Sequence, residues 1–258
     1  MSRYVRIALL MVIGLLLAVH AQAAEWGDLS GRFLYNGKAP APKPLKITKD
    51  QAICDHHGLV DESLIVGSQG ELANVFVYVR TPKPAVHPDY AKTANAEVVL
   101  DNLNCRFAPH ALVLRTTQPL VIKNSDATGH NTNLGSLKNE FNQIIPTNDK
   151  FVTHCKIEEK TPVPVRCNVH EWMKGYMLVR SNPYMAVTDT DGRFTIEKLP
   201  AGSELEFQLW HETCGFVKGS GVKGQKVDKR GRLKFTIKPG KNDWGNIRVD
   251  GAVLASRS

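Results

Sequence analysis

The sequence lacks several features that would point to common classes of partner. After residue 19, no uninterrupted apolar stretch reaches the roughly 20 residues that a membrane-spanning helix requires. No long block of basic residues and no nucleic-acid-binding motif is present, so we expect no nucleic-acid partner although the formal net charge is +8. No repeat with a period of tens of residues is visible, which excludes a solenoid.

The first residues have the pattern of a secretory signal. Two arginines precede an apolar run from Ile7 to Val19, and an Ala-Gln-Ala cleavage pattern ends at Ala23. The alternative is a retained membrane anchor, but this run is shorter than a spanning helix. We therefore predict a signal peptide over 1–23, no membrane span after its removal, and a periplasmic or secreted protein.

The rest of the chain has the pattern of an all-β protein. Residues 72–79 and 120–122 are examples of short β-prone runs, and turn-forming Gly, Pro and Asn residues separate such runs. Strands that follow one another at short intervals are typical of a Greek-key sandwich. The only helix we expect is a brief one near residues 49–54.

The loop around residue 170 carries a candidate metal site. Cys167, His170 and Met173 stand at a Cys-x2-His-x2-Met spacing between two β-prone runs. On a tight turn, such a thiolate and imidazole reach one ion, and the thioether approaches it axially; sulfur with imidazole favours copper over structural zinc. A second histidine completes a site of this kind. His130, which follows the strand-like run 120–124 and a short loop, is the best candidate.

At these residues the first part of the chain resembles the cupredoxins, the blue copper proteins of the amicyanin and plastocyanin type. In that family the first histidine is often followed by asparagine, and the other three ligands share one loop before the last strand. The resemblance implies a Greek-key sandwich that holds one type 1 copper ion. The ligands it implies are His130, Cys167, His170 and Met173, with Asn131 supporting them.

The cysteine count is odd, which in an exported protein leaves a thiol outside the disulfides. We interpret Cys167 as that thiol because of its metal-ligand pattern; the alternative is a disulfide between Cys167 and Cys155. The other four cysteines allow three connectivities, and the sequence does not choose among them. We favour Cys54–Cys105 within the first part of the chain and Cys155–Cys214 between its two parts.

The sequence after residue 181 resembles a different module. Residues 191–194 read Asp-Gly-Arg-Phe, and residues 199–202 read Leu-Pro-Ala-Gly before another β-prone run. This is similar to the carboxypeptidase-regulatory, transthyretin-like family, a small β-sandwich with a carbohydrate-binding-like fold. Secreted bacterial proteins that join the two modules, labelled as methylamine-utilisation or rhamnogalacturonan-lyase-domain proteins, are similar over nearly the whole chain. We therefore predict domains over 24–181 and 182–258.

The resemblance implies an exported type 1 copper protein that transfers single electrons to a redox protein partner through a solvent-facing edge of His170. We expect no enzyme, because the chain has no paired carboxylates placed for proton transfer. It also has no His-x-His or His-Cys-His clusters like those of multicopper oxidases. A binuclear copper centre is excluded because no second cysteine lies about four residues from Cys167.

The alternative function is a non-catalytic pair of β-sandwich modules that bind a polysaccharide or an envelope partner. Exposed aromatic platforms would support it, although aromatic residues make up only 7% of the chain and show no stacking pattern. The candidates for such platforms are Trp26, Tyr184, Trp210 and Trp244. The role of His110 stays open between metal or redox chemistry and structural hydrogen bonding.

Overall fold

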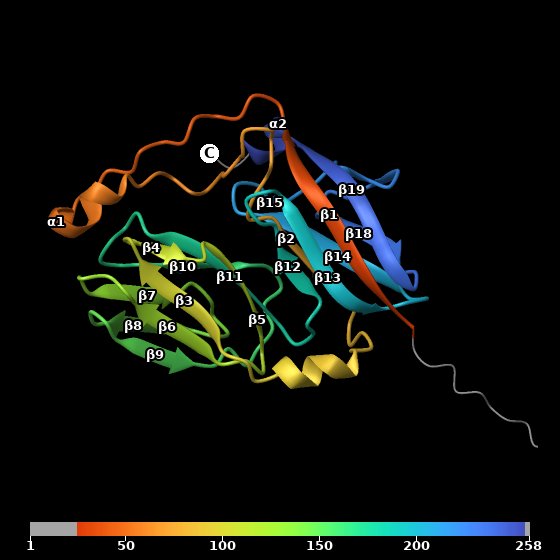
Figure 1. Ribbon diagram of the computed structural model, residues 1–258, viewed down its shortest axis with the longest axis horizontal. Helices are drawn as coiled ribbons and strands as arrows, with labels where there is room; N and C mark the ends of the chain where they lie inside the picture. Colours follow the sequence, from red (N-terminus) through yellow and green to blue (C-terminus); the bar gives the residue numbers. More distant parts are fainter. Residues whose placement is uncertain (1–24, 256–258) are drawn as a thin grey trace, which may run out of the picture.

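The computed structural model describes residues 25–255, so the predicted signal peptide over 1–23 lies outside the described residues. Strands make up most of the regular structure (Figure 1), and the all-β fold class is confirmed. The helices are short: α1 (Gln51–Cys54), α2 (Gly251–Leu254) and the 3-10 helices η1 (Asp55–His57) and η2 (Pro88–Thr93). Within the described part of the chain, no helix is long and apolar enough to cross a membrane.

Two sheets between residues 98 and 180 form what we call the first sandwich. One sheet has the strand order β5-β11-β10-β7-β8, and the other has the order β4-β3-β6-β9. The strands of the first sheet are β5 (Ala111–Arg115), β11 (Lys174–Arg180), β10 (Val163–Arg166), β7 (His130–Leu134) and β8 (Phe141–Ile145). Those of the second sheet are β4 (Arg106–Ala108), β3 (Val98–Leu103), β6 (Leu120–Asn124) and β9 (Lys150–Thr153). Leu114, Ile122 and Met177 are fully buried in the core that these sheets share.

Two further sheets form the second sandwich. One has the order β13-β1-β19; the other has the order β12-β2-β14-β15, and β18 also pairs with β14. The strands of the smaller sheet are β1 (Trp26–Asn36), β13 (Arg193–Pro200) and β19 (Gly240–Asp250). Those of the larger sheet are β2 (Phe76–Val79), β12 (Met185–Val187), β14 (Glu204–His211), β15 (Gly215–Phe216) and β18 (Arg232–Thr236). A separate hairpin joins β16 (Gly221–Val222) and β17 (Gln225–Lys226).

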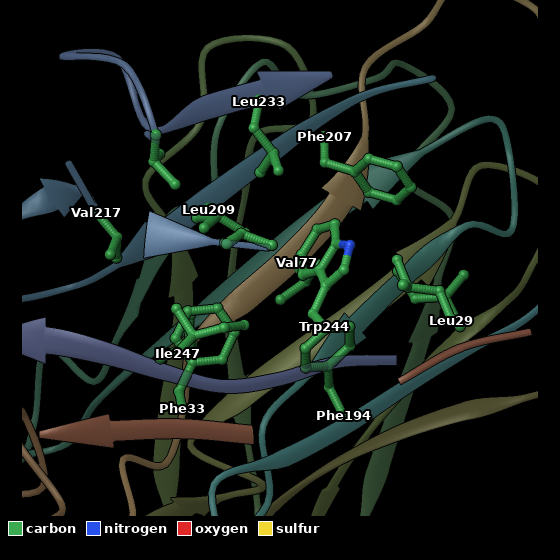
Figure 2. Close-up of a cluster of buried hydrophobic side chains, with 14 of the residues drawn as sticks. Leu29, Phe33, Val77, Phe194, Phe207, Leu209, Val217, Leu233, Trp244 and Ile247 are labelled. Atoms are coloured by element: carbon green, nitrogen blue, oxygen red, sulfur yellow. The ribbon is translucent and has the colours of Figure 1, made fainter. Parts of the chain in front are cut away.

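The core of the second sandwich combines apolar side chains from strands that are far apart in the sequence. Figure 2 shows Phe33 of β1, Val77 of β2 and Phe207 of β14 around Trp244 of β19. The Phe207 and Trp244 rings meet edge to face, with centroids 5.1 Å apart. Aromatic pairs prefer this geometry, and two more phenylalanine rings meet Trp244 in the same way, so Trp244 lies at the centre of an aromatic cluster.

The two sandwiches pack against each other through β11. Successive side chains of a strand point to opposite faces of its sheet. Accordingly, Met177 and Val179 lie in the core of the first sandwich, whereas Leu178 between them packs with Phe76 and Trp210 of the second sandwich. This double burial explains why residues 176–179 of β11 are continuously apolar instead of alternating.

Two early strands belong to the second sandwich. The parallel partner of β1 is β19, and its antiparallel partner is β13, while β2 lies between β12 and β14. Both strands fall inside the range 24–181 that the sequence predicts as one domain. The predicted domain ranges therefore group these two strands with the first part of the chain. The alternation of residues within a strand does not reveal which strand it pairs with.

Residues 37–75, which we call the connecting segment, leave the second sandwich after β1 and return to it at β2. In between they run across to the first sandwich (Figure 1), where α1 is held by a disulfide between Cys54 and Cys105. Ile47 and Trp172 pack around this disulfide. The connecting segment is therefore fixed against the loop that carries the predicted metal ligands.

Of the two favoured disulfides, Cys54–Cys105 is confirmed and Cys155–Cys214 is wrong. Cys155 is buried in the core of the first sandwich, whereas Cys214 follows β14 and packs against the core of the second. The apolar core around Cys155 separates its sulfur from the other sandwich. The alternative pairing of Cys167 with Cys155 does not form either.

Replacing Phe33 by Ala tests whether β1 is integral to the second sandwich. Because the ring is fully buried in the core, we expect the free energy of unfolding to fall by about 3–5 kcal/mol in chemical denaturation. Asn36→Ala, at an exposed position of the same strand, should change it by no more than about 0.5 kcal/mol. Equal effects of the two variants would contradict the observed packing.

Candidate metal centre

Strand register brings the predicted ligands together. In the antiparallel pair of β7 and β10, Asn133 lies opposite Arg166. The first residue of β7, His130, therefore lies beside the loop that follows β10, and this loop contains Cys167 and His170. Two strand pairs, β7 with β10 and β10 with β11, are therefore enough to bring the three residues together.

The three side chains form a compact and buried cluster. The Nδ1 atoms of His130 and His170 lie 2.9 Å apart, and the Sγ atom of Cys167 lies 3.8 Å from Nδ1 of His170. Both histidines are fully buried, and Cys167 is only 2% exposed. The three donor atoms thus lie within reach of one ion. That they bind a metal stays a prediction.

Met173, the fourth predicted ligand, closes the loop. Its carbonyl oxygen accepts a hydrogen bond from the Cys167 amide at 3.2 Å, and its own amide donates to the His170 carbonyl at 2.9 Å. The Met173 side chain is 1% exposed and belongs to the same apolar core as Cys167. These bonds place all three loop residues on one tight turn.

The sulfur of Cys167 lies in surroundings that favour a thiolate. It accepts hydrogen bonds from the amides of Asn131 and His170, both at 3.3 Å. Burial alone would raise the pKa of this thiol, but the two histidines and the two amides lower it to about 5. The thiolate is the form of cysteine that binds metals, so the lowered pKa is compatible with the predicted ligand role.

Asn131, which we predict to support the ligands, connects the two ligand-bearing segments. Its side-chain oxygen accepts from the amide of Asn168 at 3.1 Å, and its side-chain nitrogen donates to Asn142 at 2.7 Å. The residue thereby ties β7 to both β8 and the loop after Cys167. Its backbone amide is also one of the two donors to the sulfur.

Two carboxylates that are not among the residues predicted from the sequence orient the histidines. His130 donates from Nε2 to Asp126 at 2.8 Å, and His170 donates from Nε2 to Asp50 at 2.7 Å. With both Nε2 atoms engaged, both Nδ1 atoms are directed into the cluster. Metal-binding histidines commonly have such carboxylate partners, which fix the ring and raise its basicity.

The pKa values of both carboxyl groups agree with this arrangement. The hydrogen bond from His170 lowers the pKa of Asp50. Burial acts to raise the pKa of Asp126, but His130 and the amides of Asn104 and Cys105 lower it overall. Asp126 precedes His130 by four residues, a spacing that local inspection could have found. Asp50 lies 120 residues before His170, and no pattern in the sequence connects the two.

The prediction that an edge of His170 faces the solvent is wrong. Its side chain is fully buried because Asp50 of the connecting segment caps Nε2. Trp172 covers another side, with ring centroids 5.0 Å apart, and donates to the Cys105 carbonyl oxygen at 3.1 Å. The connecting segment thus shields the cluster from solvent. It can do so because it leaves the second sandwich and packs against the first.

The aromatic platforms expected for the alternative function are largely absent. Tyr184, Trp210 and Trp244 are buried inside the second sandwich or at its interface with the first. Only Trp26 is partly exposed, and its ring packs against His87. Three of the four candidates therefore serve packing and have no face available for a sugar ring.

The lowered pKa of Cys167 predicts a stability that depends on pH in the metal-free protein. An unfolded cysteine ionises near about 8.5, whereas the folded thiol ionises at about 5. Between these values the folded state binds fewer protons, so the free energy of unfolding should increase with pH. The contribution is complete above the unfolded pKa and is lost as the pH falls through about 5.

Ultraviolet thiolate absorbance and urea unfolding of the metal-free protein measure this effect. Cys167→Ser should remove both the absorbance step near pH 5 and the associated gain in stability. Cys155→Ser should leave them in place, since burial raises the pKa of Cys155 to about 11. A step that survives in Cys167→Ser would show that another group titrates.

Comparison with known proteins gives structural neighbours and no sequence relative. No protein-family model matches the chain, and no curated protein matches it. Among solved structures, a point mutant of amicyanin in its reduced Cu(I) form is 16% identical with a TM-score of 0.30, covering 40% of this chain and 98% of that one. A purple cupredoxin from Nitrosopumilus maritimus is 21% identical with a TM-score of 0.28, covering 33% and 99%. A copper-containing nitrite reductase from Thermus scotoductus is 15% identical with a TM-score of 0.29, covering 40% and 25%.

Proposed function

We propose that this protein binds one copper ion in a type 1 site and transfers single electrons to a redox protein partner. The observation that carries the proposal is the buried cluster of one thiolate and two inward-facing imidazole nitrogens. His130, Cys167, His170 and Met173 would hold the ion. Copper would supply a one-electron couple at this position.

The donor set supports copper over zinc. Structural zinc sites are closed by four cysteine or histidine ligands, whereas two histidines and one cysteine with an axial methionine are the ligands of electron-transfer copper sites. Cys105 lies near Asp126 and His130, but its sulfur is committed to the disulfide with Cys54. It therefore supplies no fourth thiolate.

The chain's own residues restrict movement around such an ion. Asp126 and Asp50 hold the two imidazoles at Nε2, and two backbone amides hold the sulfur. Side chains held in this way would move little when a bound ion changed its oxidation state, which would reduce the reorganisation that accompanies electron transfer. We propose no catalytic step for the site, and the protein is then a carrier and not an enzyme.

The shielding of His170 bears on where a partner would bind. A hollow of about 300 Å³ lies over the ligand loop and is lined by Asn131, Asn142, Ile144, Asn168 and Val169. Ile144 is an apolar side chain with 65% of its surface exposed. We expect the redox partner to approach this hollow, because Asn131 at its wall donates directly to the ligand sulfur.

Export remains part of the proposal. The pattern of residues 1–23 predicts secretion, and the Cys54–Cys105 disulfide is of the kind that persists in oxidising compartments such as the periplasm. Polysaccharide binding is not favoured by any observation on the described residues, given the burial of Tyr184, Trp210 and Trp244.

Addition of Cu(II) to the untagged, metal-free protein tests the function. We expect an intense visible charge-transfer band from the Cys167 thiolate, and Cys167→Ser should abolish it. Cys155→Ser removes a buried thiol outside the cluster and should retain the band. Absence of the band in the unaltered protein would overturn the proposal.

Replacement of Asp50 by Asn tests the capping carboxylate. The carboxylate strengthens His170 as a donor and favours the more highly charged Cu(II), so its loss should raise the reduction potential. A 10- to 100-fold selective loss of Cu(II) affinity corresponds to about 60–120 mV for a one-electron couple. Asp55→Asn is the matched control, because Asp55 is an exposed residue of the same segment. Equal shifts in both variants would mean that net charge, and not the hydrogen bond, sets the potential.

A further inference from the structure

A second group of polar side chains lies where three parts of the molecule meet. His110 comes from the loop between β4 and β5 of the first sandwich, Glu62 from the connecting segment, and Glu212 from the turn after β14 of the second sandwich. The three residues line one cavity of about 310 Å³. None of them belongs to the cluster around Cys167.

His110 is buried with one nitrogen engaged and the other unsatisfied. Its side chain is 9% exposed, and Nε2 donates to Glu212. Its Nδ1 atom is buried and has no hydrogen-bond partner within the described part of the chain. Leaving such a nitrogen unsatisfied costs free energy, so its presence on a cavity wall points to a ligand.

Glu62 faces this unsatisfied nitrogen. Its Oε1 atom is held by Arg106 at 3.0 Å, and its Oε2 atom lies 3.6 Å from Nδ1 of His110. Burial acts to raise the pKa of Glu62, but His110 and Arg106 lower it overall, so the group is ionised at neutral pH. A carboxylate oxygen and an imidazole nitrogen therefore face each other across a gap too long for a hydrogen bond.

The gap has the width that one metal ion requires. Nitrogen and oxygen ligands lie about 2.0–2.2 Å from zinc, and in tetrahedral geometry two such donors are about 3.3–3.6 Å apart. The observed separation of 3.6 Å fits. Glu212 on the opposite ring nitrogen completes the carboxylate–histidine–metal arrangement that is common at such sites.

We propose that His110 and Glu62 bind a divalent transition-metal cation of the zinc type, with Nδ1 and Oε2 as the protein donors. Water in the adjoining cavity fills the remaining positions, and Glu212 orients His110. The ion joins the connecting segment to the first sandwich, while Glu212 links His110 to the second.

The electrostatics of the pair agree with a bound cation. Burial would lower the pKa of His110, but the hydrogen bond to Glu212 and the negative charges of Glu212 and Glu62 raise it to about 9. Without metal, a proton on His110 thus supplies the positive charge that these two carboxylates stabilise. A metal ion at Nδ1 replaces that proton and leaves the Glu212 hydrogen bond intact.

Zinc titration of the full-length, untagged chain tests the site. The background variant is Cys167→Ser with His170→Ala, which removes two of the three donors of the other cluster. Isothermal titration calorimetry should then find one Zn²⁺ ion bound, and Zn²⁺ should raise the midpoint of thermal unfolding. Absence of binding in this background would overturn the proposal.

Single replacements added to this background locate the ion. Glu62→Gln and His110→Gln should each weaken Zn²⁺ binding at least tenfold, and Glu212→Gln should weaken it 10- to 100-fold by removing the charge that orients the ring and raises its basicity. Glu204→Gln is the matched control, since Glu204 is an exposed carboxylate paired with Lys234 on the second sandwich, and it should bind like the background. Thermal unfolding without metal verifies that each variant folds. Folded Glu62 and His110 variants that bind like the background would also overturn the proposal.

Discussion

The burial of one thiolate beside two imidazoles constrains the structure around the cluster of Cys167, His130 and His170. Polar groups removed from water destabilise a fold unless each finds a hydrogen-bond partner. Here the sulfur accepts from two backbone amides, and each histidine donates to a carboxylate. The short turn after β10, the loop before β7 and the connecting segment all have to be in place for these bonds to exist together.

The connecting segment links the two sandwiches structurally. Both its ends adjoin strands of the second sandwich, and its middle is held to the first by the Cys54–Cys105 disulfide. Asp50 lies next to the helix that contains Cys54, so the disulfide fixes the carboxylate over His170. The surroundings of His170 therefore depend on the connecting segment, which contributes none of the cluster's three side chains.

Local features of this protein could be predicted from sequence, and distant ones could not. Cys167, His170 and Met173 share one turn, so their spacing groups them, and the resemblance to the cupredoxins adds His130, whose strand pairs next to that turn. Asp50 and Glu62 reach their partners only because the connecting segment crosses between sandwiches. The same limit explains the Cys155–Cys214 error and the assignment of β1 and β2, since strand patterns carry no information about remote pairing.

The pairing of β1 with β19 has a consequence for the order of folding. Ser30 and Asn242 bond across a sequence separation of 212 residues, so the smaller sheet of the second sandwich cannot close until β19 has been synthesised. The strands of the first sandwich lie within 98–180 and close shorter loops, which favours their earlier assembly. β1 therefore stays unpaired, with its apolar side chains exposed, until β19 is available, and this exposure makes the folding intermediate prone to aggregation.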